Sequence, residues 1–414
     1  MSLKSLLLEN TILRFGDFIL KSSFISKLKY WRKTTSNSES ELYKIQSAKL
    51  NKILKYASES SPFYKYLNIE ENKNPYIWLK EFPILTKKTF KANLEHILTE
   101  KDEKRLISIM SSGSTGPPSK VFFNKEELSS NRALQILWWE WAGYEFGNSV
   151  LQTGVNMNRS LEKSIKDRLL STRYIDAMKH EDKQILKELI HLQMNPKDHF
   201  VAYASSLYLF AKTALENKIL DVKFKSVISL GEKLLPQFRE TIEQAFSCKV
   251  YDTYGASEGF LIASQCKEGN YHIMSPHVLV EILDEKGVEV KPGETGRVVL
   301  TGLDNYTTPL IRYEVGDLAV KGENIKCSCG LELPILKEII GRLTDFLITP
   351  SQKYITVQTV VRILKQFSEI DQFKVIQTGV NDFILEYVSP KSQVDIREQA
   401  IKEQFEEVFG EKLN

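Results

Sequence analysis

Strand-like and helix-like segments alternate over the middle of the chain, and this alternation constrains the fold more than any other feature. Short runs rich in β-branched and aromatic residues occupy 121–123, 150–152, 200–203 and 227–230. Long stretches of helical character lie between them, at 125–142, 160–195 and 236–246. Strands that alternate with helices at this spacing are typical of βαβ units. The sequence therefore predicts an α/β fold whose sheets are mainly parallel.

The regions on either side of this core have different patterns. Residues 1 to about 60 predict helices, and turn-separated strands between about 278 and 335 predict a β-barrel-like subdomain. After residue 341, a β-α-β-β-α order predicts a small α+β domain. We therefore expect a large N-terminal domain over 1–340 and a small C-terminal domain over 341–414, able to move against the first.

The N-terminal helical segment admits two interpretations. It is short, basic and rich in apolar residues such as Leu6, Leu7 and Phe18, so it could lie on a membrane surface. Acidic residues and aromatics are mixed into the same stretch, which favours a helix docked on its own domain. We adopt the docked helix as the expectation.

Composition argues against several classes of function. Of 414 residues, 42% are hydrophobic and 26% are charged, as in soluble globular proteins, and the formal net charge is +3. So small a charge does not predict nucleic acid or an anionic membrane as the main partner. No apolar run is long enough for a transmembrane segment, and the first residues lack a signal-peptide pattern. With four cysteines, the chain is expected to be a reduced, cytoplasmic protein.

The most informative segment is a loop of small and hydroxyl residues. It reads Ser111, Ser112, Gly113, Ser114, Thr115 and Gly116, and Lys120 follows. Glycines let the backbone approach a ligand closely, and the N–H and hydroxyl groups can converge on a polyanion such as a triphosphate. A strand follows the loop, whereas a helix follows a Walker motif. A flexible linker is the alternative, but linkers rarely lie between two strands inside a domain.

Four further motifs follow in order along the chain: Gly231-Glu232, Tyr254-Gly255-Ala256-Ser257-Glu258, Ile311-Arg-Tyr-Glu-Val-Gly-Asp317 and Ile339-Ile-Gly-Arg342. Together with the loop, they resemble the motifs of the adenylate-forming enzymes, and most of all the branch of phenylacetate–CoA ligases and CapK capsule proteins. The resemblance spans roughly residues 45–375. It implies that ATP converts a carboxylic acid to an acyl-adenylate, and that CoA or an amine then accepts the acyl group. In the capsule-polysaccharide relatives this amine would belong to a surface sugar.

The resemblance also implies roles for the residues around the phosphates. The loop 111–116 and Lys120 would hold the β- and γ-phosphates, and Ser257 would contact the α-phosphate. Glu258 would hold Mg²⁺. Glu258, Ser257 and Lys120 are thus the catalytic candidates, although a carboxylate in a turn is otherwise simply solvated.

The nucleoside of ATP would be bound by the remaining motifs. The adenine slot would be lined by Gly231, Glu232, Tyr254 and Gly255, with the tyrosine ring packed on the base. Asp317 would accept hydrogen bonds from both ribose hydroxyls, a geometry that suits a carboxylate. Arg342 would touch the ribose or a phosphate near the hinge. An acid pocket would involve Tyr203, Tyr208 and Phe260, which are otherwise plain core residues.

The cysteines give a separate signal. Cys327-Ser-Cys329-Gly330 predicts a knuckle-like turn, and Cys266 and His272 precede it by about sixty residues. Three thiolates and one imidazole suit a tetrahedral structural Zn²⁺, and the phenylacetate–CoA ligase branch has a similar segment. His277 is an alternative ligand, and the tight C-x-C spacing leaves unlinked cysteines as the other interpretation. Cys248 is expected to be an ordinary buried thiol.

The resemblance is incomplete at positions that serve both half-reactions: the family's late lysine acts in adenylation, and its hinge and the loop after it act in the second half-reaction. The late catalytic lysine of the family has no clear counterpart, although Lys353 or Lys412 could substitute, and the hinge position holds Thr344. The loop after the hinge has no glycine, which weakens the case for CoA more than the case for ATP. The alternative function is a nucleotide-binding scaffold or a degenerate ligase without full turnover. The acid, the acceptor and the oligomeric state stay open, with a homodimer among the options.

Overall fold

The computed structural model describes residues 3–342 except 101, 103, 105, 111–119, 155–166, 168–169, 177–181 and 324. Beyond 342 it describes 346–348, 354–356, 360, 363–364, 366–367, 370, 372–388, 398–410 and 412. Ser111, Ser112, Gly113, Ser114, Thr115 and Gly116 therefore lie outside the described residues, as do Thr344 and Lys353.

The chain forms two compact units. One comprises Met1–Val315 and Ala319–Ile339, and the other comprises Gly316–Leu318 and Ile340–Asn414. The division of the protein into two domains that move against each other stays a prediction.

An eleven-stranded sheet dominates the chain, in the order β10-β11-β12-β13-β9-β8-β7-β6-β5-β3-β4. Its parallel part is formed by β3 (Val150–Gly154), β4 (Thr172–Asp176), β5 (His199–Tyr203), β6 (Ser226–Leu230) and β7 (Val250–Ala256). The rest comprises β8 (Phe260–Gln265), β9 (Tyr271–Ile273), β10 (Val278–Leu283), β11 (Thr295–Gly302), β12 (Tyr313–Lys321) and β13 (Ile335–Arg342). The antiparallel pairs include β7–β8, β8–β9 and β10–β11. The predicted α/β fold class is confirmed.

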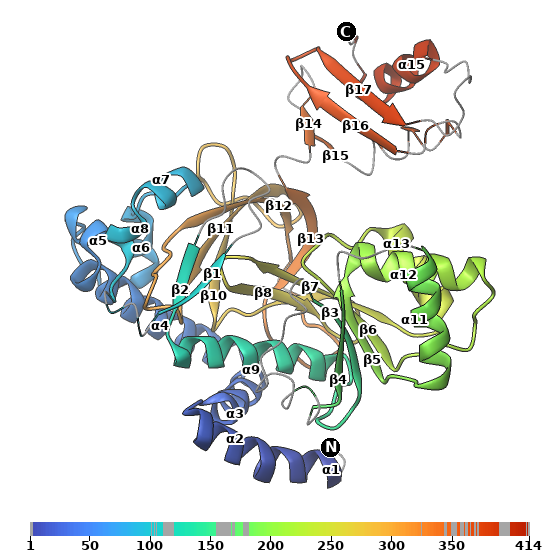
Figure 1. Ribbon diagram of the computed structural model, residues 1–414. Helices are drawn as coiled ribbons and strands as arrows, with labels where there is room; N and C mark the ends of the chain where they lie inside the picture. Colours follow the sequence, from blue (N-terminus) through green and yellow to red (C-terminus); the bar gives the residue numbers. More distant parts are fainter. Residues whose placement is uncertain are drawn as a thin grey trace. The chain divides into compact units, whose positions relative to one another are not determined.

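Helices cover both faces of the parallel strands (Figure 1). One face packs on α11 (Asp182–Met194), α12 (Ala204–Glu216) and α13 (Pro236–Phe246), and the other lies toward α9 (Lys125–Trp141). Successive residues of β5 point to opposite faces. Phe200 accordingly packs among α11–α13, and Val201 packs in the cluster that contains Trp138 of α9. This coverage explains why these strands are apolar on both sides.

One sequence expectation about this part of the chain is wrong. The stretch 160–195 was expected to be helical throughout, but β4 occupies Thr172–Asp176 and pairs in parallel with β3. A β-branched and aromatic run, Thr172 to Ile175, is a good strand former, and the open edge of β3 gives it a partner. Tertiary pairing therefore overrides the helical pattern around it.

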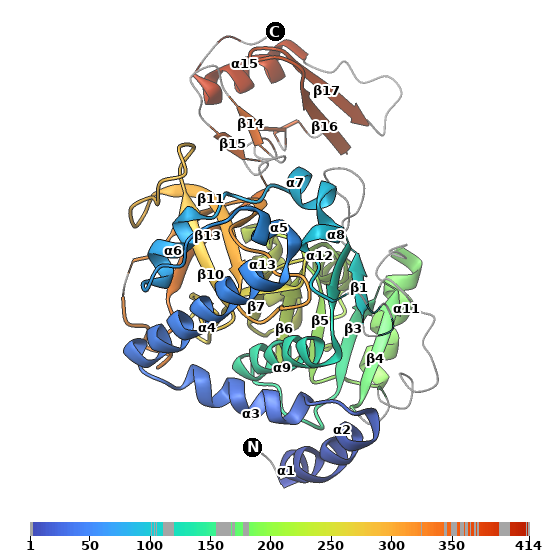
Figure 2. The same ribbon diagram turned by 90° about the vertical axis from the view of Figure 1, so that its left-hand side faces the viewer.

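The chain is helical from residue 3 to residue 97, apart from the connections between its helices. It comprises α1 (Leu3–Leu7), a π-helix η1 (Leu8–Leu13), α2 (Arg14–Leu20), α3 (Phe24–Thr35), α4 (Glu39–Ser60), α5 (Pro62–Tyr66), α6 (Pro75–Glu81), α7 (Lys87–Ala92) and α8 (Leu94–Ile97). α4 begins with a capping box in which Ser38 accepts from the backbone of Glu41. The helix α3 lies between α9 and the first helices (Figures 1 and 2). No helix among the described residues is long and apolar enough to cross a membrane.

The second unit has its own small core. Its strand pairs are β14 (Phe346–Ile348) with β15 (Tyr354–Thr356), and β16 (Gln372–Gln377) with β17 (Phe383–Val388). The helix α15 (Glu398–Phe409) buries Ile401, Phe405 and Phe409 against Ile363 and Leu364. These elements form an α+β unit of the kind that the sequence predicts.

Candidate functional site

The glycine-rich loop connects two paired strands. β1 (Ile107–Met110) and β2 (Lys120–Phe123) are antiparallel, and Met110 pairs with Lys120, so that the segment 111–119 begins and ends at one place. Thr308 fixes β2, because its hydroxyl accepts from the Phe122 N–H and donates to the Phe122 carbonyl, both at 3.0 Å. Lys120 is exposed at the start of β2. The two strands that flank this segment therefore lie side by side.

Glu258 is a buried carboxylate between β7 and β8. Glu258 is only 5% exposed, and its Oε1 accepts a hydrogen bond from the Tyr313 hydroxyl at 2.8 Å. Ser257, which is exposed, donates to Oε2 at a longer 3.4 Å. Among the residues that the structure describes, none forms an ion pair with Glu258. A buried carboxylate held by hydroxyl groups alone lacks a counter-charge, and a divalent cation would supply one.

Two glycines give the turn around Glu258 its shape. A Cβ on Gly255 would lie 2.8 Å from the carbonyl oxygen of Phe260, because the two strands pair closely there. Gly259 has φ +88°, and a Cβ on it would lie 2.2 Å from the ring of Phe123. Only glycine fits such positions, and the turn therefore holds Glu258 close to β2.

The candidate adenine residues lie at the carboxyl ends of β5, β6 and β7. Gly231 follows β6 with φ +72°, and a Cβ on it would lie 2.7 Å from the ring of Tyr203 at the end of β5. Glu232 accepts from the backbone N–H of Ser205 at 2.8 Å, and Thr253 donates to the Ser229 carbonyl at 2.8 Å. This is the edge at which parallel sheets usually bind ligands.

The aromatic residues of this region have different environments. Tyr254 is 7% exposed and packs in the main hydrophobic cluster, so stacking of adenine on its ring stays a prediction. Tyr203, which the sequence analysis placed in an acid pocket, is half-buried against Gly231. Tyr208 stacks on Phe238 with ring centroids 4.2 Å apart, and Phe260 stacks on Tyr313. Each of the three acid-pocket candidates thus has a packing role of its own.

The ribose candidates belong to the second compact unit. Asp317 is half-buried on β12, and Arg342 is half-buried at the end of β13. Lys412, a candidate substitute for the late lysine, is exposed in the same unit. The roles of all three stay predictions.

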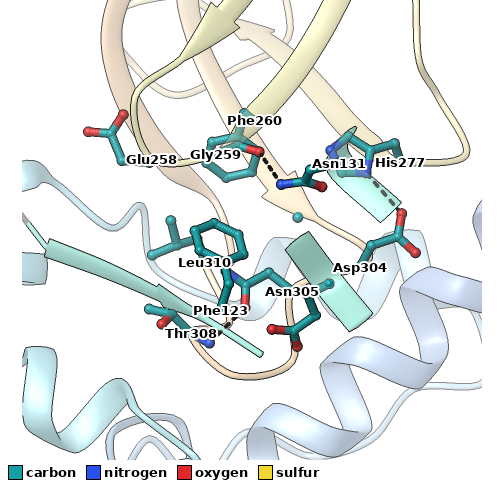
Figure 3. Close-up of a pocket in the computed structure, with 12 residues that line it drawn as sticks. Phe123, Asn131, Glu258, Gly259, Phe260, His277, Asp304, Asn305, Thr308 and Leu310 are labelled. Atoms are coloured by element: carbon teal, nitrogen blue, oxygen red, sulfur yellow. Dashed lines mark hydrogen bonds and ion pairs between the residues drawn. The ribbon is translucent and has the colours of Figure 1, made fainter. Parts of the chain in front are cut away.

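A small cavity lies beside Glu258 (Figure 3). Its lining comes from β2, α9, the turn at 258–260, the residue before β10, and the end of β11 with the loop that follows it. The lining residues are Phe123, Glu127, Asn131, Glu258, Gly259, Phe260, His277, Gly302, Asp304, Asn305, Thr308 and Leu310. Asn131 crosses it to donate to the Gly259 carbonyl at 3.1 Å. The cavity is therefore lined by polar as well as apolar groups.

A chain of polar contacts joins His277, Asp304 and Lys49, and the first two of these residues line the cavity. His277 Nδ1 lies 2.9 Å from Asp304 Oδ2, and Lys49 Nζ lies 2.7 Å from Asp304 Oδ1. Burial opposes ionisation of Asp304, but Lys49 and His277 together outweigh it and lower the pKa of this carboxyl. His277 Nε2 is buried and has no hydrogen-bond partner among the described residues. His277 thus belongs to the cavity, and it is not a member of the cysteine cluster for which it was an alternative ligand.

Sequence reasoning missed several of these residues. Tyr313 lies inside the Ile311-Arg-Tyr motif, so its position in the sequence was a usable signal. Lys49 and Asp304 are 255 residues apart and carry no local signal of their contact.

The three cysteines and His272 form a compact cluster. Cys266 follows β8, His272 lies on β9, and Cys327 and Cys329 lie in the turn between β12 and β13. Their ligand atoms all lie within 4.8 Å of one another, with Cys266 Sγ 3.7 Å from Cys327 Sγ and Cys329 Sγ 3.3 Å from His272 Nε2. Tetrahedral zinc with its usual bond lengths separates such ligand atoms by roughly 3.5–3.8 Å. The donor set and its spacing therefore fit zinc.

The surroundings of the cluster also suit a metal. His272 Nδ1 lies 3.1 Å from the Leu333 carbonyl, which orients the ring with Nε2 toward the thiols. Burial and then the neighbouring sulfurs raise the pKa of Cys329 to about 12, against a hydrogen bond from the Leu331 N–H that lowers it. Burial also raises the pKa of Cys327, but hydrogen bonds from the Cys329 backbone and the Asn270 side chain outweigh it, so that the pKa of this thiol is lowered. A bound cation removes the proton from such thiols.

The chain is similar to known proteins over most of its length. No protein-family model matches it. It is 25% identical over 372 residues to Protein CapK of Staphylococcus aureus, covering 83% of this chain and 78% of that protein. It is 24% identical over 328 residues to the phenylacetate-coenzyme A ligase of Thermus thermophilus, covering 74% and 72% respectively.

Among solved structures, the chain is similar in fold to a 2-hydroxyisobutyryl-CoA ligase in complex with R3-HIB-AMP. The TM-score is 0.71 at 17% identity, covering 92% of this chain and 87% of that one. The resemblance drawn from the five motifs is thereby confirmed.

Proposed function

We propose that the chain is an acid–AMP ligase of the adenylate-forming superfamily, and that it activates a small carboxylic acid with ATP and Mg²⁺ and transfers the acyl group to CoA or an amine. The observation that carries this proposal is the state of Glu258. Its carboxylate is buried, is oriented by the Tyr313 hydroxyl, and has no ion pair among the described residues. Mg²⁺ bound there would neutralise charge on the phosphates.

The residues around Glu258 support the roles assigned to them. Ser257 makes only a long hydrogen bond to Glu258, so its exposed hydroxyl is able to donate to the α-phosphate instead. When the carboxylate oxygen of the acid attacks the α-phosphorus, the bond to pyrophosphate breaks and negative charge develops on the phosphate oxygens. Lys120 and the N–H groups of the loop 111–116 would stabilise that charge.

The nucleoside contacts are proposed on the same basis. Gly231 and Gly255 would line the adenine slot with their backbone at the carboxyl edge of the sheet, next to Glu232 and Tyr254. Asp317 would bind the ribose hydroxyls, and Arg342 would touch the ribose or a phosphate. Tyr203 is a further candidate for contact with the base, because its ring already lies against Gly231.

The second half-reaction requires a nucleophile to attack the carbonyl carbon of the acyl-adenylate, with AMP as the leaving group. The absence of a clear late lysine and of a glycine in the hinge loop favours an amine, for example on a sugar of a capsule polysaccharide, over CoA. The similarity to Protein CapK agrees with this preference, because the name associates that relative with capsules. We propose that the enzyme acts in the cytoplasm, with a homodimer as its candidate assembly.

Pyrophosphate release with a panel of carboxylic acids tests the proposal. We expect turnover with at least one acid, and its loss in Glu258→Ala. Glu268→Ala is the matched control, because Glu268 is an exposed glutamate close by in the sequence. ATP binding without pyrophosphate release across the panel would instead support a nucleotide-binding scaffold or degenerate ligase.

We further propose that Cys266, His272, Cys327 and Cys329 hold a structural zinc ion. Four protein ligands would close the coordination sphere, so the ion would have no catalytic water. It would fix the turn at 327–330 to β8 and β9.

A further inference from the structure

The first helical segment of the chain, residues 3–20, turns its acidic groups inward. Glu9 is 2% exposed, and both its oxygens accept from Arg32 Nη1 at 2.9 Å. Asp17 accepts from the backbone N–H of Ile25 at 2.7 Å, so it fixes the start of α3. Ser5 is buried as well, and Leu8 and Leu13 are the apolar residues that pack on the domain. The segment is therefore docked, but largely through polar groups.

The outward side of the same segment carries most of its apolar residues. Eight large hydrophobic side chains there are at least 43% exposed, and Phe18 reaches 82%. They are Leu3, Leu6, Leu7, Ile12, Phe15, Phe18, Ile19 and Leu20. Single exposed apolar residues are ordinary, but so many in eighteen consecutive positions form a patch that marks an interaction site.

The charges around this apolar patch have one sign. Residues 3–33 contain seven lysines and arginines against two acidic residues, and both acidic residues have backbone or arginine partners inside. Within residues 3–21 the exposed charged side chains are Lys4, Arg14 and Lys21, all basic, and the Lys4 ammonium donates to the Gly147 carbonyl, so that Arg14 and Lys21 remain for the outward face. An outward face that is both apolar and basic matches an anionic lipid surface, where acyl chains receive the apolar groups and headgroups attract the cations.

A second copy of the chain fits this face less well. In a symmetric dimer the same patch meets itself, so the basic side chains of the two copies would be brought together. Like charges placed opposite one another disfavour such contacts. In the sequence, the acidic residues of this segment favour a helix docked on its own domain over one on a membrane. In the structure Glu9 and Asp17 are directed at Arg32 and at the start of α3, away from the patch, so they do not oppose binding of the patch to a membrane.

We propose that the outward face of residues 3–21 binds the surface of an anionic membrane without crossing it. Phe15, Phe18 and Ile19 would enter the boundary between headgroups and acyl chains, and Arg14 and Lys21 would contact the headgroups. This inference goes beyond the proposed ligase activity and does not depend on it. It would place the enzyme beside acceptors or acids that are themselves held at a membrane.

Vesicle sedimentation tests the proposal with the full-length protein. We expect binding to vesicles of phosphatidylcholine and phosphatidylglycerol at a ratio of about 7:3, and binding at least about tenfold weaker to phosphatidylcholine alone, since each basic residue near an anionic surface contributes roughly fivefold. The double variant Phe15→Ser/Phe18→Ser should bind about tenfold more weakly or worse. The charge reversal Arg14→Glu/Lys21→Glu should do the same, and it leaves the apolar groups in place.

The matched control is Tyr66→Ser/Met194→Ser, which removes two exposed apolar side chains elsewhere and should bind like the wild type. Unchanged thermal unfolding in each variant verifies that the fold is retained. Wild-type protein that ignores anionic vesicles overturns the proposal, as does a Phe15→Ser/Phe18→Ser variant that binds them normally. A dimer in light scattering that this variant dissociates would also overturn it, because a second copy would then cover the patch.

Discussion

Replacing Cys327 with serine should remove zinc from the cysteine cluster and lower the stability of the protein. Cys327 Sγ lies 3.7 Å from Cys266 Sγ, about the separation of two thiolates on one tetrahedral zinc ion. A serine hydroxyl is not ionised at neutral pH, so the variant keeps only three competent ligands. We expect zinc content to fall from about one ion per chain to below about one half.

The size of the effect follows from the loss of affinity. Changes next to metal ligands already cost 10- to 100-fold in affinity, so loss of a ligand should cost at least about 100-fold, or about 2.8 kcal/mol. If zinc saturates the wild-type protein, this difference appears in the free energy of unfolding. At roughly 2 °C per kcal/mol for a large domain, Tm should fall by about 5 °C.

Elemental analysis of protein purified without chelators, together with thermal unfolding, measures both quantities. Cys248→Ser is the matched control, since Cys248 lies outside the cluster and burial raises its pKa to about 12, which keeps it a thiol. The reasoning is refuted by wild-type protein with less than about half an equivalent of zinc and a Cys327→Ser variant that unfolds at the same temperature as Cys248→Ser.

Three further predictions follow from buried contacts. Tyr313→Phe removes the hydroxyl that donates to Glu258 and should lower kcat/KM for pyrophosphate release about tenfold or more with folding retained; an unchanged rate would argue against Glu258 as the magnesium ligand. Gly259→Ala should be about 1–3 kcal/mol less stable to urea than Gly269→Ala, because both glycines have positive φ but only Gly259 has a ring at 2.2 Å from the added Cβ; equal losses would contradict the packing argument. His199 is buried and its pKa is lowered to about 4, chiefly by burial, so the folded state holds it neutral while the unfolded chain takes up a proton below about pH 6.5. Its contribution to stability is therefore present above pH 6.5 and is lost as pH falls toward 4, by about 2 kcal/mol at pH 5, and urea unfolding of His199→Gln at pH 7 and 5 should lack this loss.

Much of the fold is readable in the sequence because its signals are local. The runs at 150–152, 200–203 and 227–230 became β3, β5 and β6 with ends shifted by one or two residues. Each is a short apolar run between helical stretches, and burial on both faces demands that composition. β4 was missed because its strand character becomes decisive only when it pairs with β3.

Some residues of the candidate site were likewise recognisable from local patterns, and others were not. The motifs around Gly231, Glu258 and Asp317 were recognised because each is a short pattern of glycine, hydroxyl and carboxylate groups. The partner of Glu258 and the chain from His277 through Asp304 to Lys49 were not, because contacts across 55 and 255 residues leave no trace in local spacing.

By itself, the sequence determined the alternation of strands and helices, the order of the five motifs and the set of candidate zinc ligands, since these depend on which residues are neighbours along the chain. Tertiary structure alone decided which polar groups are buried together and which apolar groups face outward. The sequence of residues 3–20 is compatible with a helix that turns its apolar side toward the domain or away from it. The contacts of Arg32 with Glu9 and of the start of α3 with Asp17 decide that most of the apolar side chains face outward. Burial is a property of the whole fold, and periodicity within one segment therefore cannot determine it.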